Sequence, residues 1–123
     1  MVQVIFRKDY DLIVGDCALD VFDFYEVDEM HGLSRSACIK RMAEGGTYID
    51  GLANYNPADA LAKPFVFINR QALKKTHEDV TLLMHEMVHM GLLLNDWDVL
   101  EKEEEIVTWA EAETNIIFGR YFS

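Results

Sequence analysis

The sequence predicts an α+β fold in which a few helices pack with a small sheet. Apolar runs of strand-forming residues at 2–6 and 65–69 indicate the sheet. Apolar residues recur at helical spacing over residues 79–94 and again over residues 99–118, which predicts two C-terminal helices. We expect the first of these helices to be the centre of a single domain that spans residues 1–123.

The remaining elements follow from local signals along the chain. Helically spaced apolar residues across 11–25 predict a first helix, and Ser34 is suited to cap a second helix that Gly45 and Gly46 end. Strand-forming residues at 47–54 are followed by an Asn-Pro turn signal. A polar turn at 95–98 separates the two C-terminal helices.

Composition limits the classes of partner. Twenty-two acidic residues against 11 Lys and Arg give a formal net charge of −11, which would repel a nucleic-acid backbone. The charge either favours a basic protein or peptide as partner or is an ordinary solvated acidic surface. No apolar run approaches the length of a membrane span, and the N-terminus has no signal-peptide core, so we expect a cytoplasmic protein without a membrane partner. Cys17 and Cys38 form no C-x-x-C pattern and are expected to be reduced.

One motif in the sequence has residue types and spacing that are typical of a metal site. Residues 84–90 read Met-His-Glu-Met-Val-His-Met and contain the pattern H-E-x-x-H. In a helix, His85 and His89 lie on one face about one turn apart, so both imidazoles can reach a single zinc ion. Glu86 lies beside them as a candidate base for a zinc-bound water. The alternative interpretation is a buried helix whose histidines form hydrogen bonds in the core.

A catalytic zinc site needs a third protein ligand and an open position for water. No His or Cys follows His89, so the ligand is sought among downstream glutamates. The candidates are Glu101, Glu103, Glu104, Glu105, Glu111 and Glu113. If the last helix returns antiparallel to the motif helix, a residue about five positions into it reaches the level of His89. The predicted inward face of this helix comprises Val107, Ala110, Thr114 and Ile117. We expect Glu104, three residues before Val107, with Glu103 and Glu105 as alternatives.

The motif together with the glutamate-rich stretch 103–107 resembles the zincin metallopeptidases of the glutamate-ligand class. The similarity covers about residues 64–118 and is nearest to short, single-domain H-E-x-x-H proteins of phages and mobile elements. The resemblance implies a minimal zincin-like domain, with a small sheet packed on the central motif helix and a glutamate-bearing helix after it. It also implies that residues 65–69 form the edge of the active site and hold an extended substrate by β-addition.

The resemblance implies a Zn²⁺ ion held by His85, His89 and Glu104, with Glu86 as the catalytic base. The predicted function is therefore a zinc metalloendopeptidase that hydrolyses a peptide bond in a protein substrate. The alternative is a catalytically inactive protein of the same fold, a binding module with a structural metal or none.

Overall fold

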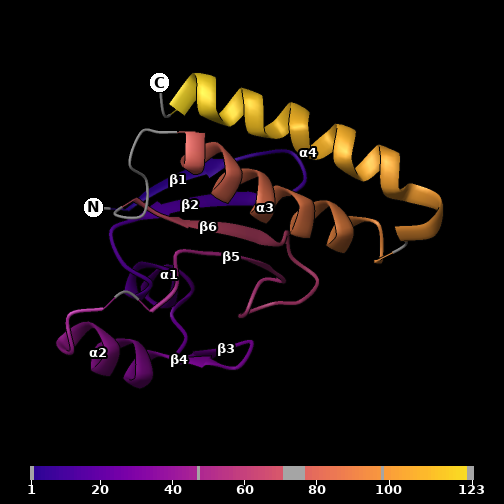
Figure 1. The fold of residues 1–123 in the computed structure, drawn as a ribbon. Helices are drawn as coiled ribbons and strands as arrows, with labels where there is room; N and C mark the ends of the chain where they lie inside the picture. Colours follow the sequence, from indigo (N-terminus) through magenta and orange to yellow (C-terminus); the bar gives the residue numbers. More distant parts are fainter. Residues whose placement is uncertain (1, 47, 71–76, 98, 122–123) are drawn as a thin grey trace. The chain divides into compact units, whose positions relative to one another are not determined.

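The computed structural model describes residues 2–46, 48–70, 77–97 and 99–121. The chain divides into two compact units, Met1–Ala72 and Leu73–Ser123. In the described residues the first unit contains the strands and two helices, and the second contains two long helices (Figure 1). The predicted α+β class is confirmed.

A four-stranded mixed sheet organises the first unit. Its strands are β1 (Gln3–Phe6), β2 (Asp11–Gly15), β5 (Gly51–Asn54) and β6 (Phe65–Asn69), in the spatial order β1-β2-β6-β5. β6 pairs parallel with β2 and antiparallel with β5, and every residue of β6 is buried. The strand at 65–69 is confirmed, but the expectation that it forms an edge is wrong. The edges of this sheet are β1 and β5.

The predicted helix at 11–25 is wrong in its first half. Residues 11–15 form β2, and α1 (Leu19–Tyr25) begins only after a turn. Leu12, Ile13 and Val14 are consecutive and fully or almost fully buried, as in a strand covered on both faces, and such a run also satisfies helical spacing. Gly15 ends the strand: a Cβ there would lie 2.6 Å from Oδ2 of Asp20, the atom that accepts the N–H of Asp16.

The second helix matches its sequence signals. α2 (Arg35–Ala43) begins after Ser34, whose hydroxyl accepts the backbone N–H of Ala37 at 3.2 Å. Before it, the chain forms a short hairpin of β3 (Glu29–Met30) and β4 (Leu33–Ser34). The Arg35 guanidinium donates to the carboxylates of Asp23 and Asp28, which ties the start of α2 to the end of α1.

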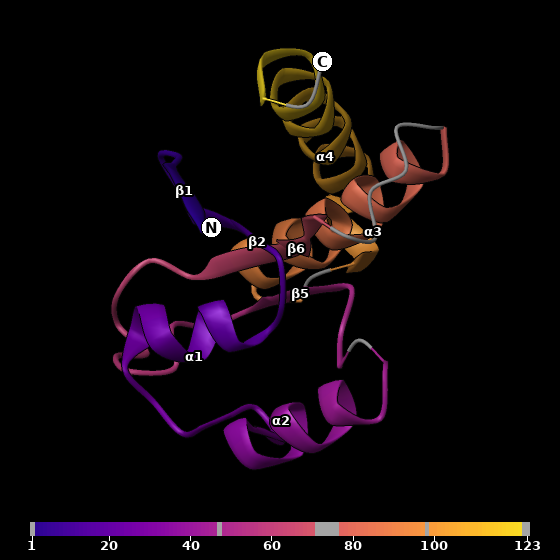
Figure 2. The ribbon, with the colours of Figure 1, turned by 90° about the vertical axis from the view of Figure 1, so that its left-hand side faces the viewer.

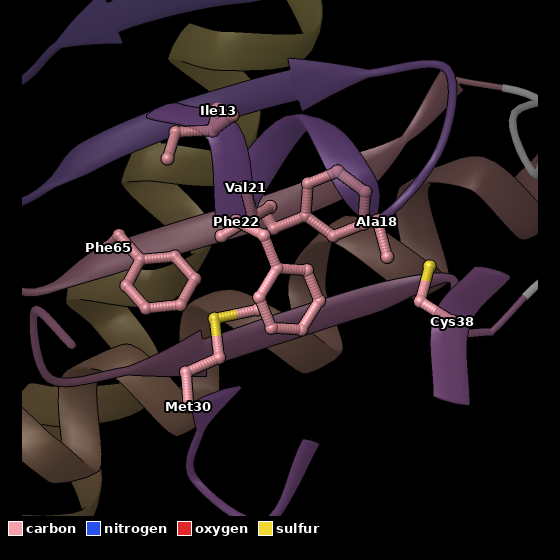
Figure 3. Close-up of a cluster of buried hydrophobic side chains, with 8 residues drawn as sticks. Ile13, Ala18, Val21, Phe22, Met30, Cys38 and Phe65 are labelled. Carbon is pink, nitrogen blue, oxygen red and sulfur yellow. The ribbon is translucent and has the colours of Figure 1, made fainter. Parts of the chain in front are cut away.

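Helices α1 and α2 lie on one side of the sheet (Figure 2). The core between them and the strands is a cluster of buried side chains in which Phe22, Met30 and Phe65 lie close together (Figure 3). The buried members are Ile13, Ala18, Val21, Phe22, Met30, Cys38, Phe65 and Phe67. Cys17 and Cys38 are not joined by a disulfide in the structure.

The second unit is a pair of helices, α3 (His77–Leu94) and α4 (Val99–Tyr121), that pack on each other (Figure 1). Gly91 permits this approach, because a Cβ there would lie 3.0 Å from Ile106 and 3.3 Å from Trp109. α3 ends where Asp96 and Trp97 adopt left-handed backbone angles and the Trp97 N–H bonds the Leu92 carbonyl at 2.7 Å. Within the described residues no helix has the length and apolarity of a membrane span.

The inward face of α4 differs in part from the predicted one. The prediction comprised Val107, Ala110, Thr114 and Ile117. The last three are buried, whereas Val107 is 37% exposed and Ile106 takes its place at 2%. Both phases satisfy helical spacing, and the contact of Ile106 with Gly91 decides between them.

Replacing Phe22 by Ala is expected to destabilise the protein by about 3–5 kcal/mol, because it removes a fully buried aromatic side chain and leaves a cavity. Urea unfolding followed by circular dichroism measures the change. Ile39→Ala is the matched control, because Ile39 is 52% exposed and its truncation should change stability by no more than about 0.5 kcal/mol. Equal losses in both variants would contradict the described core.

Candidate metal centre

His85 and His89 converge on one side of α3. Their Nε2 atoms lie 3.0 Å apart, and their rings are nearly perpendicular with centroids 4.5 Å apart. Two nitrogen ligands at about 2.0–2.1 Å from one tetrahedral zinc would be separated by roughly this distance. The helix thus points both nitrogens at one place, as the i, i+4 spacing predicts.

Partial burial and the neighbouring His85 lower the pKa of His89 from its ordinary value of 6.5. The lowered pKa favours the neutral imidazole, which is the form that binds a metal. His85 is more accessible, with 64% of its side chain exposed. The pair is therefore open to solvent on one flank and chemically suited to act as ligands.

Glu86 lies on the opposite, buried flank of the histidines. Its side chain is 8% exposed, and Oε1 lies 4.0 Å from Nε2 of His85. Leu83 and Met90, one turn before and after it on α3, are fully buried. This burial raises the pKa of Glu86 from 4.5 to about 7. A carboxylate whose pKa is near neutrality can both accept and release a proton at physiological pH.

Contacts between the helices define which part of α4 lies beside the histidines. The Thr114 hydroxyl lies 3.5 Å from the Met84 sulfur, and Ile106 and Trp109 lie beside Gly91. Since His85 and His89 lie between Met84 and Gly91, the residues of α4 at their level lie between Trp109 and Thr114. Glu111 and Glu113 are in this segment.

Glu104 lies elsewhere. It precedes Ile106 and is therefore beyond Gly91, toward the C-terminal end of α3. At about 100° per residue, a position two before Ile106 points away from the contact face, and Glu104 is exposed. The structure does not bring Glu104 to the histidines. The prediction that the fifth or sixth residue of α4 reaches the level of His89 is wrong. Ile106, the eighth residue of α4, contacts Gly91, so the residues before it lie beyond Gly91.

Glu111 and Glu113 lie on opposite sides of the pair formed by α3 and α4. His85 follows the contact residue Met84 by one position, and Glu111 follows the buried Ala110 by one position. In antiparallel helices the same step leads to the same side of the pair, so Glu111 shares the side of His85. Glu113 precedes Thr114 and falls on the other side. Within the described residues, no three His, Cys, Asp or Glu side chains converge closely enough to hold a metal.

A groove of about 480 Å³ borders the histidines. Its described lining consists of Thr81, Met84, His85, Val88 and His89. Apart from the imidazoles and one hydroxyl, the side chains that line it are apolar. The sequence contains one signal of this groove: Met84 and Val88 each precede a motif histidine and therefore lie on a neighbouring stripe of the helix.

Comparisons with protein-family models, curated proteins and solved structures find no match for this chain.

The buried Glu86 predicts a specific pH dependence of stability. The pKa of Glu86 is raised in the folded state, so its contribution to stability is fully present below pH 4.5. This contribution is lost as the pH rises from 4.5 through about 7, because the unfolded chain gives up the proton more readily than the folded protein does. The difference between the two pKa values corresponds to roughly 3 kcal/mol. In metal-free protein, Glu86→Gln should therefore gain about this much stability relative to wild type between pH 4 and pH 8.

Urea unfolding of both proteins across this pH range measures the gain. Glu105→Gln is the control: Glu105 is exposed, so its effect should not vary with pH by more than a few tenths of a kcal/mol. A constant difference between wild type and Glu86→Gln would show that Glu86 is not desolvated.

Proposed function

We propose that this protein is a zinc-dependent peptidase whose ligands include His85 and His89 and whose catalytic base is Glu86. The observation that supports the proposal most directly is the combination of two converging Nε2 atoms with a buried carboxylate beside them. A structural histidine pair in a core would not require an acidic neighbour with a pKa near 7.

The donor set fits zinc, which binds neutral imidazole nitrogen and carboxylate oxygen in tetrahedral sites. When bound, the ion supplies Lewis-acid polarisation of a peptide carbonyl and makes water more acidic. Glu86 accepts a proton from the attacking water and transfers it to the leaving amine. Burial keeps the carboxylate poorly solvated, which strengthens it as a base.

We propose Glu111 as the third ligand in place of the expected Glu104. Its support is twofold: its level along α4, between the contacts at Met84 and Gly91, and its position on the side of His85. Glu111 is exposed, so its side chain can turn toward the histidines without displacing core residues. Glu104 is the alternative, and it requires α4 to shift by about two turns along α3.

Purified protein incubated with zinc is expected to hold about one ion per chain, measured by mass spectrometry of metals after gel filtration. His85→Ala should lose it, because a single imidazole and a carboxylate make a weak site. Glu86→Gln should retain zinc and lose cleavage of a proteome-derived peptide mixture. Equal behaviour of wild type and Glu86→Gln would favour a binding module, and absence of zinc would overturn the proposal.

The third ligand is tested by zinc affinity in three matched variants, Glu104→Ala, Glu111→Ala and Glu113→Ala. Loss of a direct ligand should weaken binding by more than the roughly 10–100-fold that an outer partner contributes. We expect this loss in Glu111→Ala alone, measured by competition with a chromogenic chelator. A loss confined to Glu104→Ala would contradict the helix register and support the set implied by the resemblance.

A further inference from the structure

Cys17, Cys38 and Met42 place three sulfur atoms around one part of the first unit. Cys38 and Met42 lie four residues apart on α2, and Sγ of Cys38 lies 3.8 Å from Sδ of Met42. Cys17 and Met42 line the same cavity of about 230 Å³. Figure 3 shows the Cys38 sulfur directed toward Ala18, the residue that follows Cys17. Burial, and then the nearby Cys17 thiolate, raise the pKa of the Cys38 thiol, so the two cysteines also interact electrostatically.

Local hydrogen bonds hold the segments that carry these sulfurs. The cap of Ser34 on the backbone of Ala37 fixes the start of α2, one residue before Cys38. The turn before α1 is closed twice: the Asp20 N–H donates to the Cys17 carbonyl at 3.1 Å, and the Asp20 carboxylate accepts the N–H of Asp16 at 3.0 Å. The cluster is therefore largely formed before any ligand binds.

The donor atoms indicate the class of ligand. Thiolates and thioethers are soft ligands that select Cu(I), whereas a thioether is not among the usual ligands of zinc. At metal–sulfur distances of about 2.3 Å, two sulfur ligands of one ion lie roughly 3.8–4.0 Å apart, in agreement with the separation of Cys38 and Met42. We propose that Cys17, Cys38 and Met42 bind one Cu(I) ion.

Access and charge are consistent with such a site. Met42 is 37% exposed and Cys17 is partly exposed, so an ion can enter from solvent, whereas Cys38 is fully buried. Binding replaces the two thiol protons, which pass to solvent, and it needs no oxidant or reductant. The positive charge of Arg35 counteracts the effects of burial and of Cys17 on Cys38 and favours its thiolate. The inference is independent of the proposed peptidase function, because the two share no residue.

Titration of Cu(I) into the reduced protein in oxygen-free buffer, in competition with a chromogenic Cu(I) chelator, tests the inference. The ultraviolet charge-transfer absorption of thiolate-bound Cu(I) should saturate at one ion per chain and reports on the cysteines alone. Cys17→Ser should abolish this tight binding. Met42→Leu should weaken it by roughly tenfold or more, because the substitution removes a ligand and conserves side-chain volume.

Met30→Leu is the matched control, because it makes the same substitution at a buried methionine of the same core and should leave the affinity unchanged. His85→Ala should also leave it unchanged, which separates this site from the candidate metal centre. Circular dichroism verifies that each variant is folded. Equal affinities of Met42→Leu and Met30→Leu, or wild-type affinity in Cys17→Ser, would overturn the inference. Displacement of Cu(I) from the thiolates by equimolar zinc would overturn the assignment to copper.

Discussion

The close contact of α3 with α4 at Gly91 determines how α4 lies beside the candidate metal centre. No other residue type fits there without displacing Ile106 or Trp109, since even a Cβ would approach them within 3.0 and 3.3 Å. This contact, with that of Met84 and Thr114, sets the register of the two helices. The register in turn determines which glutamates of α4 lie at the level of the histidines along the helix pair.

A second constraint is the unequal burial of adjacent residues in the motif. His85 is largely exposed, whereas Glu86, the next residue, is almost completely buried. A helix produces this contrast because successive side chains point about 100° apart. Water and a metal can therefore reach the imidazoles, while desolvation raises the pKa of the carboxylate. The same rotation places the apolar groove on the remaining flank.

Sequence patterns predicted elements well where one signal dominated. The cap at Ser34, the motif helix and the strand Phe65–Asn69 all carry strong local signals, and each is confirmed. Prediction failed at residues 11–15, where Leu12, Ile13 and Val14 fit a buried strand and a helix equally. It also failed for the role of β6, because strand order depends on pairing between distant segments.

The sequence by itself determined the convergence of His85 and His89, because four residues of helix suffice to bring their nitrogens together. It likewise determined the position of Glu86 beside them. Only the tertiary structure decided that Glu86 is buried, that β6 is interior and that Ile106 rather than Val107 faces α3. These properties depend on which surfaces meet after the chain has folded. Helical periodicity limits the choice to a few faces, and long-range packing selects one of them.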